Sequence, residues 1–173
     1  MITHEELREI LPHTSETRIM LFADPLNASM EEFEIDTPER QAAFIAQIAH
    51  ESGGLRYVRE LASGEAYEDR ADLGNTETGD GVRFKGRGLI QITGRANYRL
   101  CGEALGVDLV GNPELLETPD LACRSAAWFW KDRGLNELAD KGDFKLITKR
   151  INGGYNGYRE RLAFYEKAQE VLT

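Results

Sequence analysis

The sequence of 173 residues predicts a single, mainly α-helical domain with a minimal β element. Three observations support this fold class. Helix-capping sequences recur along the chain, two central segments begin with the same Thr-Pro-acid pattern, and only one short stretch alternates apolar with polar residues. A chain of this length can bury roughly two thirds of its unfolded surface. Since no repeat or Pro/Ser-rich linker divides it, we expect one domain over residues 1–173.

The first elements are predicted from caps and from one proline. Thr3 and Glu6 have the spacing of a capping box, which indicates a helix at the N-terminus. Residues 15–24 and 27–35 predict two short helices, separated at Pro25 because proline disrupts a helix interior.

Two repeated start signals predict the central helices. Thr37-Pro38-Glu39 and Thr118-Pro119-Asp120 each supply a cap residue, a proline at the first helical position and an acid in the first turn. We expect helices over 38–52, which Gly53-Gly54 ends, and over 119–133. The second is apolar on most sides, so we predict a buried helix with its tryptophans in the core.

The remaining elements follow from periodicity. Residues 143–151 and 157–172 predict two helices separated by a glycine-rich turn. Residues 89–93 alternate and predict a short strand. Its period of two puts Ile90 and Ile92 on one face, and Gln91 and Thr93 on the other.

Composition excludes several classes of function. The formal charge of −9 argues against general nucleic-acid binding, and no apolar run is long enough to cross a bilayer. The N-terminus lacks a secretory signal, so we expect synthesis in a cytoplasm. A local basic stretch comprises Arg83, Lys85, Arg87, Arg95 and Arg99. It either binds a substrate that carries carboxylates or balances the charge of nearby acids.

Cysteine and histidine usage indicates neither a disulfide framework nor a metal site. We expect Cys101 and Cys123 to be reduced and partly buried. His4, His13 and His50 are scattered and unpaired with cysteine, so we predict no zinc site and no cofactor.

A pair of carboxylates carries the candidate chemistry. Glu51 continues the apolar stripe of Phe44 and Ile48, where partial burial would raise its pKa and keep it able to donate a proton; a glutamate turned to solvent is the alternative. Glu60 follows beyond the Gly-Gly break, and glycosidases need two such groups, about 6.5–9.5 Å apart for inversion and about 5–5.5 Å for retention. Three further acids compete with Glu60 for the role of base: Glu65, Glu68 and Asp69.

The polar face of residues 89–93 supplies a third element. The hydroxyl of Thr93 could hold an attacking water, and the amide of Gln91 could bind an acetamido or hydroxyl group. The alternative for Thr93 is an ordinary strand threonine.

Taken together, these segments resemble glycoside hydrolase family 19, which contains chitinases and phage endolysins. The resemblance covers roughly residues 38–170 and rests on residues 49–54, on residues 86–93 with Asn97-Tyr98, and on residues 151–154 and 161–165. It implies a lysozyme-like helical fold with two lobes, an inverting mechanism and no metal. The compact size is most similar to the endolysin branch, without a separate wall-binding module.

The resemblance also assigns roles. It implies that Glu51 is the general acid, Glu60 the base and Thr93 the residue that positions water. It places four residues at the substrate or the cleft, with His50 beside the acid as structural support: Gln91, Asn97, Asn152 and Arg161. Family chitinases often carry serine at position 93 and an aromatic residue at 96, where this chain has Ala96.

The leading hypothesis is a monomeric endolysin that hydrolyses peptidoglycan strands, made in a bacterial cytoplasm and reaching the wall after membrane permeabilisation. A chitinase, a lytic transglycosylase and a non-catalytic glycan-binding protein are the alternatives. A phage lysozyme fits less well because Ala66 stands where that group carries threonine. Cysteine-dependent wall amidases fit poorly, because their catalytic histidine follows the cysteine in sequence, whereas all three histidines of this chain precede Cys101.

Overall fold

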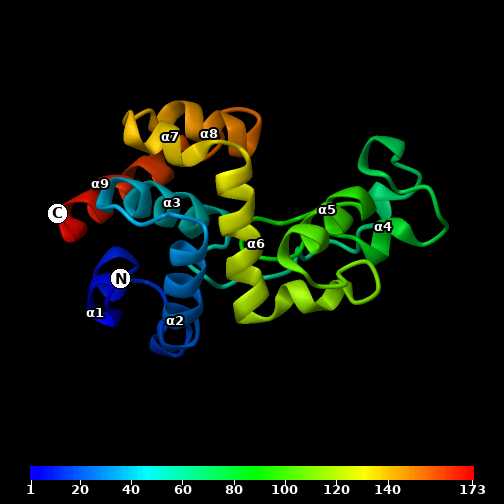
Figure 1. Cartoon of the computed structure of the whole chain (residues 1–173), viewed down its shortest axis with the longest axis horizontal. Coiled ribbons are helices and arrows are strands. Elements are labelled where there is room, and N and C mark those ends of the chain that lie inside the picture. Colours follow the sequence, from blue (N-terminus) through cyan, green and yellow to red (C-terminus); the bar gives the residue numbers. More distant parts are fainter.

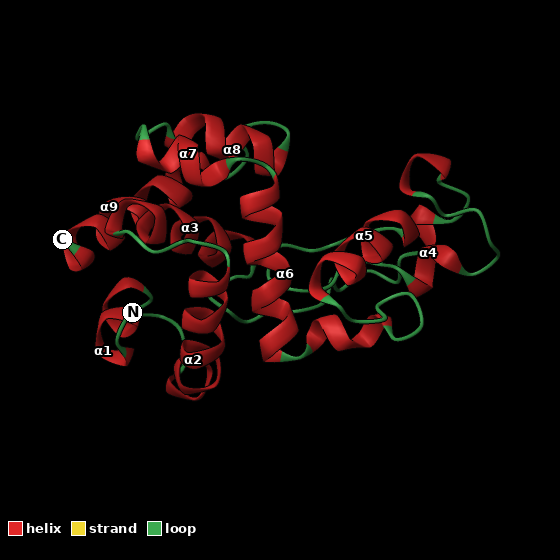
Figure 2. Ribbon diagram, viewed as in Figure 1, coloured by secondary structure: helices red, strands yellow, loops and turns green.

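The structure is a computed structural model that describes residues 1–173. It consists of helices and loops, as Figure 2 shows, with two isolated antiparallel bridges that pair Arg59 with Arg87 and Arg87 with Ile92. The α-helices are α1 (His4–Ile10), α2 (Glu16–Glu32), α3 (Pro38–Glu51), α4 (Asp80–Arg83), α5 (Arg95–Leu105), α6 (Pro119–Asp132), α7 (Leu135–Asp140), α8 (Phe144–Asn152) and α9 (Tyr158–Leu172). Three short 3-10 helices are η1 (Glu65–Tyr67), η2 (Ala71–Leu73) and η3 (Pro113–Glu117). The mainly helical fold class is confirmed.

The helices form two lobes that lie on either side of α6 (Figure 1). One lobe contains both chain termini and the helices α1, α2, α3, α7, α8 and α9; the other contains α4 and α5. In the first lobe α3 packs along α9, and α2 packs against α6. Loop segments connect the lobes across α6, so residues from distant parts of the sequence meet between them.

The predicted starts of α1, α3 and α6 are confirmed. Thr3 and Glu6 form the expected capping box, and the Thr37 hydroxyl accepts a hydrogen bond from the backbone of Arg40 at the start of α3. The Thr118 side chain behaves differently, because it donates to the carbonyl of Leu115 and does not cap α6.

The predicted break at Pro25 is wrong, because α2 runs through the proline as one helix. A proline removes one helical hydrogen bond and crowds the preceding turn. Here buried side chains line the helix on both sides of that point, with Ile19 and Phe22 before it and Leu26 and Met30 after it. Burial of this continuous apolar face offsets the local cost of the proline.

The predicted strand over 89–93 is also wrong. The backbone of Arg87 and Ile92 exchanges two hydrogen bonds, of 3.1 and 2.8 Å, which close a tight turn between them. Gly88 and Gln91 both have a positive φ, 87° and 61°, and this reverses the chain where an extended strand was expected. A side chain at residue 88 would also meet the Ser125 hydroxyl at 2.8 Å, so the turn needs glycine there.

The core is one cluster of 40 buried apolar residues. At its centre the rings of Phe44 in α3 and Trp130 in α6 meet edge to face, with centroids 5.3 Å apart. Cys101 and Cys123 are free and buried, as expected, and burial raises the pKa of Cys101 to about 12 and that of Cys123 further. None of the helices has the length and apolarity that crossing a membrane requires.

Candidate active site

Glu51, the last residue of α3, contacts a buried arginine from α9. The distance from Arg161 Nη2 to Glu51 Oε1 is 2.6 Å; Arg161 is 1% exposed, and the Glu51 side chain is 21% exposed. Two further acceptors hold the guanidinium in place, because Arg161 donates to Gln47 Oε1 at 2.6 Å and to the Asn156 carbonyl at 3.0 Å. Glu51 therefore lies in a charged, hydrogen-bonded site. It does not lie among apolar side chains, as its place on the apolar stripe of Phe44 and Ile48 had predicted.

This contact leaves one oxygen of Glu51 available. Arg161 engages Oε1, while Oε2 has no hydrogen-bond partner within the chain. The side chain is partly exposed, so Oε2 is the atom that can carry a proton to a ligand.

Glu60 is held by the other lobe through two donors. The backbone N–H of Gly86 donates to Oε1 at 2.7 Å, and the Tyr67 hydroxyl donates to Oε2 at 3.0 Å. Burial, reinforced by the Glu60 carboxylate, raises the pKa of Tyr67, so its hydroxyl remains a donor. A carboxylate that accepts at both oxygens suits an ionised group, and each oxygen can accept one further bond.

Gly86 brings Glu60 close to the two polar residues of the 88–93 turn. A Cβ atom at residue 86 would lie 2.7 Å from Gln91 Oε1 and 3.3 Å from Thr93 Oγ1, so the glycine lets these side chains approach its backbone. The carbonyl of Gly86 accepts from the backbone N–H of Glu60, and the N–H of Gly86 donates to the Glu60 side chain. The structure therefore gathers Glu60, Gln91 and Thr93 around Gly86, although by a turn and not by a strand face.

Thr93 and Gln91 line a small cavity of about 140 Å³ with Asn97 and aromatic residues of α6. The Thr93 hydroxyl donates to the Gln91 carbonyl at 3.0 Å, which leaves its oxygen lone pairs free to accept. Asn97 donates to the Thr93 carbonyl at 2.9 Å and fixes the turn against α5. Trp130 lies in the core as expected, whereas Trp128 lines this cavity.

The remaining predicted site residues lie near the N-terminal end of α9. His50 contacts Glu160 at 2.8 Å through Nδ1, and its ring packs on Gly157, where a Cβ atom would come within 2.2 Å. These contacts agree with a supporting role for His50. Asn152 ends α8, half-buried, and takes no part in the hydrogen bonds that join the other candidates.

The three competing acids have other positions. Glu68 accepts from the backbone N–H groups of Gly79 and Gly81, at 2.8 and 2.9 Å, and these bonds lower its pKa. It therefore stabilises the loop before α4. Glu65 and Asp69 lie in the same loop region, and neither contacts Gly86 or Thr93.

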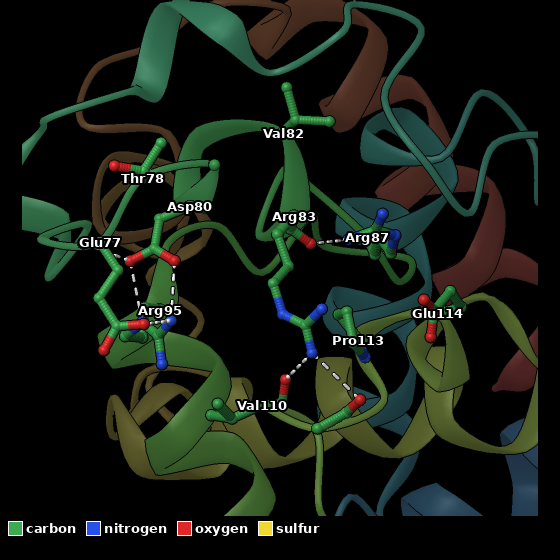
Figure 3. A pocket seen from close by; sticks show the side chains of 12 residues that line it. Glu77, Thr78, Asp80, Val82, Arg83, Arg87, Arg95, Val110, Pro113 and Glu114 are labelled. Atoms are coloured by element: carbon green, nitrogen blue, oxygen red, sulfur yellow. Dashed lines mark hydrogen bonds and ion pairs between the residues drawn. The ribbon is translucent and has the colours of Figure 1, made fainter.

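Two arginines of the basic stretch, Arg87 and Arg95, are paired with neighbouring acids. Figure 3 shows a wide cavity of about 820 Å³ in the α4–α5 lobe, where Asp80 pairs with Arg95 at 2.8 Å and Arg83 donates to the Val110 carbonyl at 2.8 Å. Arg87 pairs with Glu117 at 2.9 Å. These contacts agree with arginines that balance nearby acids.

Sequence reasoning missed two polar residues of the site. Gln47 lies one helical turn before Glu51 on the same side of α3, so its (i, i+4) spacing was a signal. Tyr67 gave none, because only the fold of the loop after Glu60 brings its hydroxyl to that carboxylate.

Residues 33–139 match the family model described as chitinase class I, of glycoside hydrolase family 19. A glycosyl hydrolase family 19 domain-containing protein of Haemophilus influenzae is 32% identical, over 95% of this chain and 94% of the relative. Acidic endochitinase SP2 of Beta vulgaris is 34% identical over 76% of this chain, which spans about half (49%) of that relative.

Solved structures share the fold. A bacterial family 19 chitinase has a TM-score of 0.83 at 23% identity, covering 99% of this chain and 94% of its own. Chitinase C of Streptomyces griseus has a TM-score of 0.80 at 22% identity, covering 99% of this chain and 76% of its own. The arrangement of two helical lobes around α6 is thus the one these structures have.

Proposed function

Because this chain belongs to glycoside hydrolase family 19, we propose that it is a muramidase-type enzyme that hydrolyses the β-1,4 bonds of bacterial peptidoglycan. The observation that carries the proposal is the unequal bonding of the two carboxyl groups. Glu51 has an oxygen without a partner, whereas both oxygens of Glu60 accept hydrogen bonds beside Thr93. One group is suited to donate a proton and the other to accept one.

The reaction then requires one displacement. Glu51 Oε2 gives its proton to the glycosidic oxygen as the bond from that oxygen to the anomeric carbon breaks. Arg161 holds the other oxygen of Glu51, so the acid keeps its position while its charge changes. The carboxylate left after proton transfer is stabilised by the adjacent guanidinium.

The nucleophile is a water between Glu60 and Thr93. One proton of this water is transferred to Glu60. Its other O–H stays intact and donates a hydrogen bond to Thr93 Oγ1, whose own hydrogen is donated to the Gln91 carbonyl. The water oxygen attacks the anomeric carbon from the face opposite the leaving sugar, so the configuration inverts. Gln91 and Asn97, in the same cavity, are placed to bind the acetamido or hydroxyl groups of the glycan.

Peptidoglycan is preferred over chitin because of one site. Ala96 packs on Gly74, where a Cβ atom would lie 2.7 Å from the Ala96 side chain. Family chitinases often carry an aromatic residue at this position, whereas the methyl group of Ala96 offers no ring for a sugar to stack on. The chain lacks a stacking ring at position 96, so we expect the polar side chains of Gln91 and Asn97 to contribute more to glycan binding, beside Trp128 in the same cavity.

The biological role that we propose is that of an endolysin. The enzyme would be made in a bacterial cytoplasm, reach the wall after another protein permeabilises the membrane, and act as a monomer. Detection of the native protein outside intact cells would contradict this route.

A chitinase is the second candidate, favoured by the names of relatives and structural neighbours, which include an endochitinase and chitinases. A lytic transglycosylase is less well supported because it needs one glutamate, whereas the bonds that Tyr67 and Gly86 make to Glu60 hold a second one beside Thr93.

The experiment is digestion of purified peptidoglycan and of chitin hexamers by wild-type enzyme and Glu51→Gln. We expect new reducing muramic acid ends from peptidoglycan, first in the α configuration by NMR, and a loss of at least about a thousandfold in kcat for the variant. Its melting temperature should change little, because an amide still accepts from Arg161. Retained activity would exclude Glu51 as the acid, activity on chitin alone would support a chitinase, and 1,6-anhydro ends would indicate a transglycosylase.

A further inference from the structure

Two neighbouring cavities form a groove along α5 and α6. The small cavity beside Thr93 and a second one of about 490 Å³ share three lining residues: Asn97, Trp128 and Arg133. A glycan bound at Thr93 therefore has a continuation past Arg133, at the end of α6.

The guanidinium of Arg133 is the unusual group in this groove. It donates no hydrogen bond to the chain, and its nearest carboxylate oxygen, in Asp132, is 3.8 Å away. It stacks on the Phe129 ring at 3.6 Å from the centroid, while the Arg133 carbonyl accepts a bond from Arg150 at 3.2 Å. The cation is thus oriented by stacking and by a fixed backbone, with its donors left unused.

Burial lowers the pKa of Arg133, and the negative charge of Asp132, 3.8 Å away, only partly offsets this loss of hydration. The side chain is nevertheless 38% exposed, so a ligand can reach it. Other arginines of the chain contrast with it, because Arg40 and Arg124 each bind a carboxylate through two nitrogens.

The distribution of charge shows which end of the groove suits an anion. Arg133 is the one charged residue among those that line the cavity beside Thr93. The second cavity also contains Glu103 and Asp132, whose negative charges oppose an anion there. An acidic group is therefore favoured on the Thr93 side of Arg133.

We propose that Arg133 binds a carboxylate of the glycan and gives the enzyme its preference for acidic N-acetylhexosamine strands over neutral ones. This inference rests on the proposed function, because peptidoglycan carries carboxylates and chitin does not. Two sources offer the same chemistry: the lactyl group of muramic acid in strands without peptides, and the stem peptides in intact strands. Arginine suits both because its planar fork can donate two parallel hydrogen bonds to one carboxylate.

The test measures binding without turnover, in the Glu51→Gln background. Calorimetry compares four hexasaccharides: alternating N-acetylglucosamine and N-acetylmuramic acid with free lactyl groups, its methyl ester, the same strand with stem peptides, and chitohexaose. We expect one or both acidic strands to bind about tenfold or more tightly than the ester, and Arg133→Gln to abolish this difference. A preference confined to the free-lactyl or peptide-bearing strand identifies which source supplies the carboxylate.

Two controls separate a specific contact from bulk charge and from misfolding. Arg8→Gln removes the same charge from α1, where Arg8 forms an exposed pair with Glu16 of α2, and should leave all four affinities unchanged. Chitohexaose should bind Arg133→Gln within about twofold of its parent, which also shows that the groove is intact. Arg133→Lys keeps the charge but loses the planar fork, and should retain part of the preference.

Two results would overturn the inference. One is equal binding of the ester and both acidic strands, and the other is a loss of affinity on Arg133→Gln that is the same for chitohexaose. Failure of the proposed function gives a different signal, since the enzyme with Glu51 intact would then leave peptidoglycan uncut while these affinities still report on Arg133.

Discussion

Tyr67 is a residue whose role depends on a single hydroxyl. It donates to Glu60 Oε2, and the other oxygen of that carboxylate accepts from the backbone N–H of Gly86. The two donors fix the plane of the carboxyl group, which determines where a water can lose its proton. Tyr67 therefore acts on the reaction through Glu60.

For Tyr67→Phe we expect kcat to fall about tenfold with KM nearly unchanged, because the ring remains and one donor to the base is lost. Steady-state kinetics on soluble peptidoglycan fragments measure both constants, and circular dichroism checks the fold. An equal rise in KM with kcat unchanged would instead place Tyr67 in substrate binding.

At the scale of elements, the end of α8 and the start of α9 position the acid. Gly157 precedes α9 with a φ of 71°, its carbonyl accepts from the Arg161 backbone at 2.9 Å, and the His50 ring lies against it. This one glycine therefore links the supporting histidine to the arginine that holds Glu51.

We expect Gly157→Ala to destabilise the protein by about 2–4 kcal/mol, because a Cβ atom there would overlap the His50 ring and the residue must keep a positive φ. Gly153→Ala is a matched control, since residue 153 also has a positive φ, 81°, with nothing within 4 Å of the new atom. Its cost should be about 1 kcal/mol, from the backbone alone. Urea unfolding compares the two; equal costs would mean that the His50 contact is unimportant.

Some helices could be predicted from local sequence signals, whereas others depend on packing against the rest of the chain. The start of α3 was predictable because Thr37 and Pro38 act locally, whereas the continuity of α2 through Pro25 depends on burial against other helices. Residues 89–93 form a turn and not the predicted strand. Leu89, Ile90 and Ile92 are apolar because they are buried, and the positive φ of Gln91 could not be predicted from its residue type. Gln91 and Thr93 nevertheless line one cavity, although Ile92, which was expected on the opposite face, lines it as well.

At the scale of the whole molecule, ion pairs join distant segments. Arg40 in α3 binds Asp140 at the end of α7, and Arg124 in α6 binds Glu32 in α2. In the other lobe the buried carboxylate of Asp80 accepts from Arg95, and these hydrogen bonds lower the pKa of Asp80. Carboxylate pKa values are lowered in the first lobe too, where Arg40 lowers the pKa of Asp140 and Arg124 lowers the pKa of Glu32.

These directions fix how stability changes with pH. A carboxyl group whose pKa is lower in the folded state stabilises that state above the unfolded pKa, about 3.9 for aspartate, and loses the contribution as pH falls through the folded pKa. We therefore expect the free energy of unfolding to decrease steadily below about pH 4. For Asp80→Asn the loss should be about 2 kcal/mol at pH 7 and smaller at pH 3. Urea titrations at both pH values measure it, and an equal loss at each pH would contradict the charge-based account.

The overall fold could be predicted because helix caps, glycine breaks and short motifs are local signals, whereas the assignment of Glu51 and Glu60 as the catalytic pair stays a prediction. The pairing of Glu51 with Arg161 connects residues 110 positions apart, and the neutralisation of part of the basic stretch by Asp80 and Glu117 depends on how loops fold back. Such long-range contacts decide which of several acids and arginines are used, and a local pattern does not contain them.

The two buried thiols allow local unfolding of the protein to be measured by thiol labelling. Because burial raises the pKa of both Cys101 and Cys123, almost no thiolate is present at neutral pH, and a thiol reagent reacts only when the surrounding helices separate. Cys101 lies on α5 and Cys123 on α6, two helices that pack against each other, so comparison of the two labelling rates shows whether these helices open together. Because both thiols stay buried in the folded protein, oxidants in solvent are expected to leave them unmodified until the surrounding helices separate.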